Sequence, residues 1–361
     1  MTAQHNNLNN MKLKLSIILI SGILFLIGCE KQSVNNPVSI QKEAIKGLVT
    51  MGSVNDLLHG NFDVLKEVNI HPDIYSGVVI RVTWSDLEPQ RGSFNFSSIE
   101  TALDRIRHYN NIHNNHKLGA KLRVSATVNT PNWVLALSGG PVEIVLSNSN
   151  SIDVGLFWTD DYRQAWQELQ QELSKNYDDN PLINEVCITS ATMVTDEPFV
   201  TIFNQATIVN LHAKGFTDNA YKQALIGALD DYSYWKNTPL DFSFNMYREI
   251  DNGYPVNNLS FTLSLINDFR SRYGKRAVIS NHGLQENLSA GAIPIYNKFL
   301  ELGNPIATQT KSPNDLTDQT FRVGLSYEVS EFEIWDSMES GGPADFNIDD
   351  LKRWEKILEN H

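Results

Sequence analysis

Eight short apolar segments alternate with longer segments of helical periodicity along most of this chain. Short apolar runs are typical of strands buried on both faces, as in a parallel sheet covered by helices. Eight parallel strands are the number that closes a barrel, so we predict a (β/α)8 TIM barrel, with a doubly wound open sheet as the alternative. The predicted strands are Gly47–Ser53, Gly77–Trp84, Ala120–Val128, Val186–Met193, Phe242–Tyr247, Ala277–Asn281, Ile306–Thr310 and Phe332–Trp335.

Amphipathic periodicity predicts the helices that connect these strands. Asp160 or Asp161 is expected to cap the second helix and Asn347 or Asp345 the last, whereas Asp315–Arg322 is only loosely helical. No Gly-rich phosphate loop follows any predicted strand, so we expect no nucleotide cofactor. The predicted helices are Ile99–Tyr109, Asp161–Lys175, Ala220–Lys236, Leu259–Tyr273, Ile293–Leu302 and Ile348–Leu358.

The N-terminal region carries a targeting pattern. Two lysines, Lys12 and Lys14, precede the apolar run Leu15–Gly28, which is too short to span a bilayer and is typical of a signal peptide. The run ends Leu-Ile-Gly-Cys29, which resembles the lipobox of bacterial lipoproteins and implies that Cys29 is lipidated; an ordinary anchor helix is the alternative. We therefore expect a signal peptide at 1–28, a lipidated cysteine and tether at 29–45, and the barrel at 46–361.

This pattern predicts a domain outside the cytoplasm, anchored to the membrane of a bacterial cell envelope. Glu30 after the lipidated cysteine favours the outer membrane. Beyond Cys29 the chain holds only Cys187, so the barrel is expected to be stabilised by its core without a disulfide.

The net charge of −13 disfavours nucleic acid as a partner, because an acidic surface repels a phosphate backbone. The seven tryptophans suit flat, neutral ligands such as sugar rings, although they are equally suited to a core. His113 and His116 stand in an Asn-rich turn that reads as a solvated loop, and no cysteine or carboxylate cluster completes a metal site there. We therefore predict no metal.

Reactive groups of such a barrel lie at the carboxyl ends of its strands. Arg81 stands inside the apolar second strand, where burial requires a carboxylate partner. The pattern R-x-x-W-x-x-L-E-P-x-x-G-x-F-x-F at Arg81–Phe96, followed by Val124–Trp133, resembles the clan of retaining (β/α)8 glycoside hydrolases that includes β-galactosidases and cellulases. This resemblance implies a carbohydrate substrate and two catalytic glutamates, an acid/base after the fourth strand and a nucleophile on a later one.

Glu197 matches the acid/base, since Asp196-Glu197-Pro198 stands where the clan has Asn-Glu-Pro. If both carboxylates point inward, they raise each other's pKa, which suits a general acid. The alternative is an exposed loop acid.

The predicted seventh strand carries no acid, and Gln309 in the nucleophile's place would give an inactive binding protein. Alternation places Glu331, Glu333 and Trp335 on the inward face of the eighth strand. Glu333 is then either the nucleophile, held ionised by Arg81, or only a charge partner of that arginine. Glu328 is a further candidate if these strands are misassigned.

Other residues at strand ends are expected to bind the sugar. Tryptophans supply apolar faces for stacking, and amide, hydroxyl and imidazole groups bind hydroxyls. The predicted substrate-binding residues are Arg81, Trp84, Asn129, Trp133, Asn245, Tyr247, His282, Gln309, Glu331 and Trp335. The sequence thus predicts an extracytoplasmic glycoside hydrolase with Glu197 and Glu333 as catalytic residues. A non-catalytic carbohydrate-binding lipoprotein is the alternative, and a structural or adhesion protein is a distant one.

Overall fold

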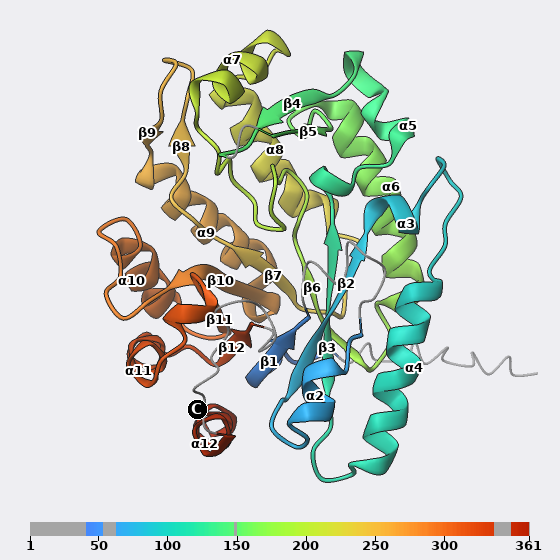
Figure 1. The fold of residues 1–361 in the computed structure, drawn as a ribbon, viewed down its shortest axis with the longest axis vertical. Helices are drawn as coiled ribbons and strands as arrows, with labels where there is room; N and C mark the ends of the chain where they lie inside the picture. The colour runs from blue at the N-terminus through green and yellow to red at the C-terminus, as the bar shows by residue number, and fades with distance from the viewer. Residues whose placement is uncertain (1–40, 53–62, 148–149, 336–347, 361) are drawn as a thin grey trace, which may run out of the picture. The chain divides into compact units, whose positions relative to one another are not determined.

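The computed structural model describes residues 41–52, 63–147, 150–335 and 348–360. Within them eight parallel strands close into a barrel in the order β1-β12-β11-β10-β7-β6-β3-β2 (Figure 1). This confirms the predicted TIM barrel and excludes the open sheet. The strands are β1 (Gly47–Met51), β2 (Gly77–Thr83), β3 (Gly119–Ser125), β6 (Ile183–Cys187), β7 (Leu240–Ser243), β10 (Ala277–Leu284), β11 (Ile306–Thr310) and β12 (Glu331–Ile334).

Helices lie around the barrel and connect its strands (Figure 1). The helix predicted at Asp161–Lys175 is capped by Thr159, which accepts a hydrogen bond from the Tyr162 N–H, so neither Asp160 nor Asp161 is the cap. The loosely helical segment is a helix that begins at Asp318. The long helices are α4 (Ser97–Ile112), α6 (Asp160–Tyr177), α7 (Gln205–Ala213), α8 (Asp218–Asp231), α9 (Leu259–Tyr273), α10 (Ile293–Leu302), α11 (Asp318–Ser326) and α12 (Ile348–Glu359).

The barrel strands separate an apolar outer layer from a charged interior. On β12, Phe332 and Ile334 join the main hydrophobic core, and Phe332 packs on Phe321 of α11 with ring centroids 4.9 Å apart. Glu331 and Glu333 point the other way and bind Lys121 across the barrel. The alternation predicted for this strand therefore matches the packing.

The fourth barrel strand differs from its prediction. The apolar run was expected to be a strand at Val186–Met193, whereas β6 ends at Cys187 and the chain continues as a buried loop. Ala191 and Phe199 in this loop have φ of 56° and 96°, which a strand does not allow. Tyr221 of α8 fixes both residues, because its hydroxyl donates to the Ala191 carbonyl and accepts from the Phe199 N–H. The apolar run is thus buried as a loop at the barrel mouth.

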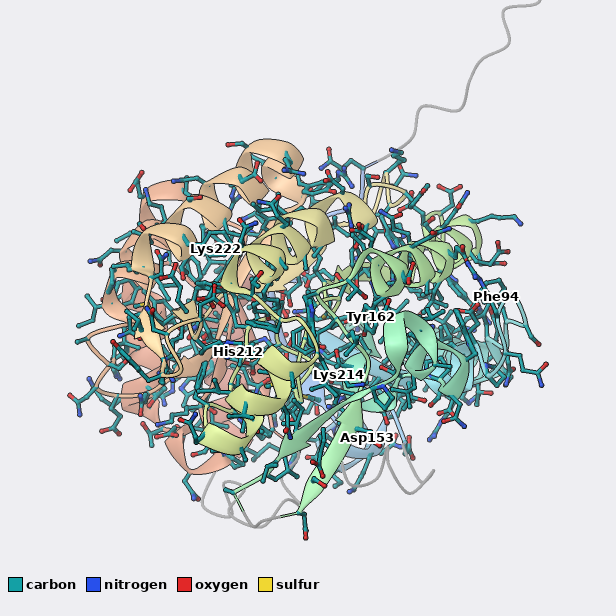
Figure 2. All side chains as sticks on the ribbon, turned by 90° about the horizontal axis from the view of Figure 1, so that it is seen from above. Phe94, Asp153, Tyr162, His212, Lys214 and Lys222 are labelled. Atoms are coloured by element: carbon teal, nitrogen blue, oxygen red, sulfur yellow. The ribbon has the colours of Figure 1, made fainter. Side chains whose placement is uncertain are left out.

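Two hairpins and several short helices are added to the barrel. The hairpin of β4 (Val142–Val145) and β5 (Ser151–Val154) packs against α7, and Figure 2 shows Lys214, which follows α7, near the hairpin that carries Asp153. The second hairpin pairs β8 (Arg248–Glu249) with β9 (Val256–Asn257). The short helices are α2 (Lys66–Ile70), α3 (Trp84–Leu87) and α5 (Asn132–Leu135). None of these additions was predicted, because each is only a few residues long.

Several sequence predictions lie outside the described residues. These are the signal peptide, the lipidated Cys29, most of the tether, and the capping residues Asn347 and Asp345. Within the described part of the chain, no helix is long and apolar enough to cross a membrane.

Glu355 makes stability depend on pH. Its carboxyl group accepts hydrogen bonds from the Leu48 N–H and the Ser76 hydroxyl, and burial raises its pKa from 4.5 to about 8. The unfolded chain ionises this group near pH 4.5, while the folded chain keeps it protonated to about pH 8. The free energy of unfolding should therefore fall across this interval, by on the order of 5 kcal/mol from this group.

We expect Glu355→Gln to remove this contribution, so that the variant gains stability relative to the parent protein as pH rises from 5 to 8. Urea unfolding at several pH values measures the difference. Lys352→Gln, at an exposed position of the same helix, is the control and should change stability by less than about 0.5 kcal/mol at any pH. Parallel stability curves for the parent and Glu355→Gln would contradict the prediction.

Candidate active site

A buried ammonium group lies at the centre of the barrel interior. Lys121 Nζ is 3.0 Å from Glu185, 2.9 Å from Asp241 and 3.0 Å from Glu333, and it also contacts Glu331. The Lys121 side chain has no exposure. Burial by itself would lower the lysine pKa, but the four carboxyl groups outweigh it and hold the pKa well above 10.5. Lys121 therefore stays charged and joins strands β3, β6, β7 and β12.

Arg123 adds a second buried cation two residues along β3. Its Nη2 lies 2.5 Å from Glu333 Oε1. Burial would raise the pKa of Glu333, yet the charges of Arg123 and Lys121 prevail and hold it well below its usual range. Glu333 is therefore a permanently ionised counter-ion.

Glu185 and Glu331 behave differently although they contact the same lysine. Burial raises the pKa of both carboxyl groups. The charge of Glu185 raises the pKa of Glu331 further, whereas a hydrogen bond from Glu331 lowers that of Glu185, so the proton is held most strongly at Glu331. We therefore assign a shared proton to this pair. Protonation removes one negative charge from a cluster in which carboxyl groups outnumber cations.

Above this cluster, a cavity of about 290 Å³ opens at the barrel mouth. Asp196 and Glu197, from the loop after β6, both line it, as do Arg81 and Arg123. The two acids diverge: Asp196 reaches towards β2 and β3, and Glu197 towards β7 and β10. Two carboxylates with separate partners thus share one cavity.

Asp196 is the partner of Arg81. Arg81 Nη2 lies 2.8 Å from Asp196 Oδ2, and the Asp196 side chain is 10% exposed. Burial opposes ionisation, but Arg81, Arg123 and a hydrogen bond from Ser125 keep the Asp196 pKa below its ordinary value. The prediction that Arg81 needs a carboxylate matches the structure, whereas the expectation that this carboxylate is Glu333 is wrong.

Glu197 is held from the opposite side of the cavity. His282 Nδ1 lies 3.1 Å from Glu197 Oε1, and the Asn245 amide donates to Glu197 Oε2 at 2.8 Å. The side chain is 22% exposed. Glu197 is therefore positioned in the barrel mouth, and the alternative of a free loop acid is excluded.

The structure brings together most of the predicted binding residues. Arg81, Asn129, His282, Gln309 and Trp335 line the cavity with Glu197. Asn245 binds Glu197 directly, and Trp133 lies half-buried with its indole N–H on the Glu88 carbonyl.

Besides Trp133, which does not line the cavity, four predicted residues are buried away from it. Trp84 has no exposure and packs edge-on against Trp166, so neither face is open to a sugar. Tyr247 is buried and donates its hydroxyl to the Asp218 carbonyl. Glu331 lies in the interior cluster on Lys121. Glu333 is 1% exposed and lines neither this cavity nor its neighbour, because Lys121 and Arg123 hold it in the floor.

Lys121 and Arg123 were missed at the sequence level. Both stand in Gly119–Ser125, a segment predicted to be an ordinary buried strand. The available signal was a pair of cations two residues apart, since positions i and i+2 face the same side of a strand. As for Arg81, burial of these two cations in an apolar strand requires carboxylate partners.

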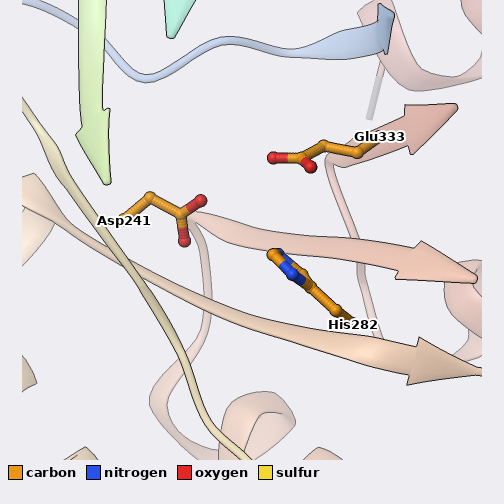
Figure 3. Close-up of side chains that lie close together, drawn as sticks. All are labelled: Asp241, His282 and Glu333. Atoms are coloured by element: carbon orange, nitrogen blue, oxygen red, sulfur yellow. The ribbon is translucent and has the colours of Figure 1, made fainter. Parts of the chain in front are cut away.

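Asp241, His282 and Glu333 come from β7, β10 and β12 and approach one another (Figure 3). One possible metal-ligand atom of each lies within 4.8 Å of the other two. However, both carboxylates already bind Lys121, and Glu333 also binds Arg123, so a metal ion would meet two buried cations. The charge arrangement opposes a metal here. His113, one of the two histidines predicted to lie in a solvated loop, binds the Asp73 carboxylate.

No protein-family model and no curated protein sequence matches this chain. Several solved structures do match. Endo-glycoceramidase II from Rhodococcus sp. is 12% identical over 87% of this chain and 80% of that chain, with a TM-score of 0.52. The fold is that of glycoside hydrolase barrels.

Two β-galactosidases give the same result. The Rahnella sp. R3 enzyme is 13% identical over 88% of this chain and 57% of that chain, with a TM-score of 0.51. The Bacillus circulans sp. alkalophilus enzyme is 10% identical over 89% and 56%, with a TM-score of 0.52. The resemblance inferred from Arg81–Phe96 is thus confirmed as a likeness of fold, and at these identities it extends no further.

The charged cluster around Lys121 should contribute to the stability of the fold. We expect Lys121→Met to lower the free energy of unfolding by about 3 to 5 kcal/mol, because it leaves buried carboxylates without their cation. The loss should be larger at pH 8 than at pH 5, since the carboxyl groups can take up protons at the lower pH. Lys117→Met, at an exposed position just before the same strand, is the control. Urea unfolding tests this, and a pH-independent loss below about 1 kcal/mol would contradict it.

Proposed function

We propose that this protein is a glycoside hydrolase whose two carboxyl groups are Glu197 and Asp196. The observation that carries the proposal is that both line one cavity but have opposite environments: Asp196 on an arginine, Glu197 on a histidine and an amide. Glycoside hydrolysis requires one carboxyl group that gives a proton and one that is ionised. Two carboxyl groups with such different neighbouring side chains can take these two different roles.

Glu197 is the proposed general acid. It is partly exposed at the mouth, where it can reach the oxygen of a glycosidic bond and protonate the leaving sugar. His282 and Asn245 orient its carboxyl group. If Asp196 acts as the nucleophile, a second step follows in which Glu197, now ionised, takes a proton from the incoming water or sugar hydroxyl.

Asp196 is the proposed ionised partner. Arg81 keeps it charged, so it can stabilise the positive charge that develops at the anomeric carbon, as nucleophile or as base for a water. Trp335 lines the same cavity half-buried and offers an apolar edge to the sugar ring.

A second candidate is carbohydrate binding without hydrolysis. It is favoured by Gln309, which lines the cavity on the seventh barrel strand, where the resembled clan has its nucleophile. An amide there binds sugar hydroxyls but cannot attack carbon. The two candidates share the ligand and the cavity and differ only in whether Asp196 replaces the missing acid.

For the location, the proposal rests on the sequence. The basic residues, the apolar run and Cys29 support a lipid anchor that holds the barrel outside the cytoplasm of a bacterial cell, on the outer membrane. Oligo- and polysaccharides are accessible there.

Hydrolysis of a panel of aryl glycosides and oligosaccharides tests the proposal. We expect Glu197→Gln to reduce kcat/KM about 10²- to 10⁴-fold, the usual contribution of a general acid. Aryl glycosides with good leaving groups should be less affected, because they need less protonation. Asp196→Asn should abolish activity on all substrates.

Glu333→Gln and Lys214→Gln complete the experiment. Glu333→Gln is expected to lower the free energy of unfolding, because it breaks the Lys121 and Arg123 pairs, whereas the exposed Lys214→Gln should change neither stability nor activity. Full activity in both Glu197→Gln and Asp196→Asn would refute the assignment. Binding of a glycan by a parent protein without any turnover would favour the second candidate.

A further inference from the structure

A second, larger cavity of about 650 Å³ lies on the other side of Glu197. Glu197 and His282 line both cavities, so their contact forms a shared wall. The larger cavity is built by the segment after β7, the β8–β9 hairpin, and the loops after β10 and β11. A sugar chain bound with its glycosidic bond at Glu197 extends into this space.

Two cations line the larger cavity without a carboxylate partner. Arg248, on β8, and Lys311, directly after β11, are both exposed. Among the described residues, no carboxylate lies within ion-pair distance of either, although many arginines and lysines elsewhere on this protein are paired. Other exposed cations in the described part of this protein are also unpaired, but Arg248 and Lys311 differ from them in lining one large cavity together.

The rest of the lining supplies no compensating negative charge. Glu197 is the one acid among the described residues that line this cavity, and His282 and Asn245 already bind it. Neutral amides and hydroxyls contribute the other polar side chains, namely those of Asn245, Asn257, Asn281, Gln285, Thr201 and Ser289. The Arg248 guanidinium lies 5.0 Å from the centroid of the Phe203 ring, which holds it against an apolar surface at the cavity.

We propose that this cavity binds an acidic sugar unit, whose carboxylate or sulfate group pairs with Arg248 and Lys311. This inference rests on the proposed function, because it names the substrate class of the same site. The strongly negative protein repels a long polyanion, so the class is an oligosaccharide, or a mainly neutral glycan, with an acidic unit next to the bond at Glu197.

The purified protein is applied to a glycan array that carries neutral, uronate-containing and sulfated oligosaccharides. The array identifies the class of oligosaccharide that the protein binds. Calorimetry then compares one bound acidic oligosaccharide with its neutral counterpart, the methyl ester of a uronate or the unsulfated form. We expect the acidic form to bind at least tenfold more tightly, with an affinity that falls as NaCl is added.

Substitutions of the two cations test whether they cause the preference for the acidic oligosaccharide. Arg248→Gln and Lys311→Gln should each weaken binding of the acidic oligosaccharide about tenfold, because each removes a charge-assisted contact, and leave the neutral form almost unaffected. Lys46→Gln, an exposed cation at the amino-terminal end of β1, is the matched control and should change neither affinity.

The outcomes separate this inference from the proposed function. Equal binding of acidic and neutral forms, or wild-type affinity in both cavity variants, overturns the inference, and hydrolysis that depends on Glu197 would still uphold the enzyme. Conversely, charge-dependent binding without turnover supports the acidic subsite and overturns the hydrolase. A uronate response without a sulfate response, or the reverse, identifies the anionic group.

Discussion

The contact between Lys121 and four carboxyl groups is the interaction on which the rest of this barrel depends. TIM-barrel interiors are usually filled with layers of branched apolar side chains. Here a lysine from β3 binds acids from β6, β7 and β12, so one cation links half of the barrel. Desolvation of these groups is expensive, and only a closed barrel brings all of them within contact distance. Closure of the barrel and neutralisation of its buried charges therefore depend on each other.

The same cluster positions the mouth above it. Arg123 binds Glu333 in the floor and at the same time lowers the pKa of Asp196 in the cavity. His282 lies beside Glu333 and Asp241 on its inner side and binds Glu197 (Figure 3). The carboxyl groups of the site are thus held by side chains that are themselves fixed by buried charges, an arrangement that favours a rigid site.

The sequence predicted the barrel because each strand is a local apolar run, and Leu259–Tyr273 and Ile293–Leu302 were predicted with their observed bounds. It also predicted that Arg81 needs a carboxylate. It did not identify Asp196 as that partner, since the two residues are far apart in the chain and the intervening loop resembled a strand. Burial of that loop depends on Tyr221 of α8, a contact that no local pattern reveals. Likewise, the acids around Lys121 come from three distant strands.

The central claim is that a glycosidic bond lies at Glu197, between the two cavities. A crystal structure of the Glu197→Gln variant with a bound oligosaccharide tests it most directly. We expect a glycosidic oxygen within hydrogen-bond distance of the residue 197 amide, with one sugar unit beside Asp196 and the next beside Arg248. An oligosaccharide bound elsewhere on the barrel, with both cavities empty, would contradict it.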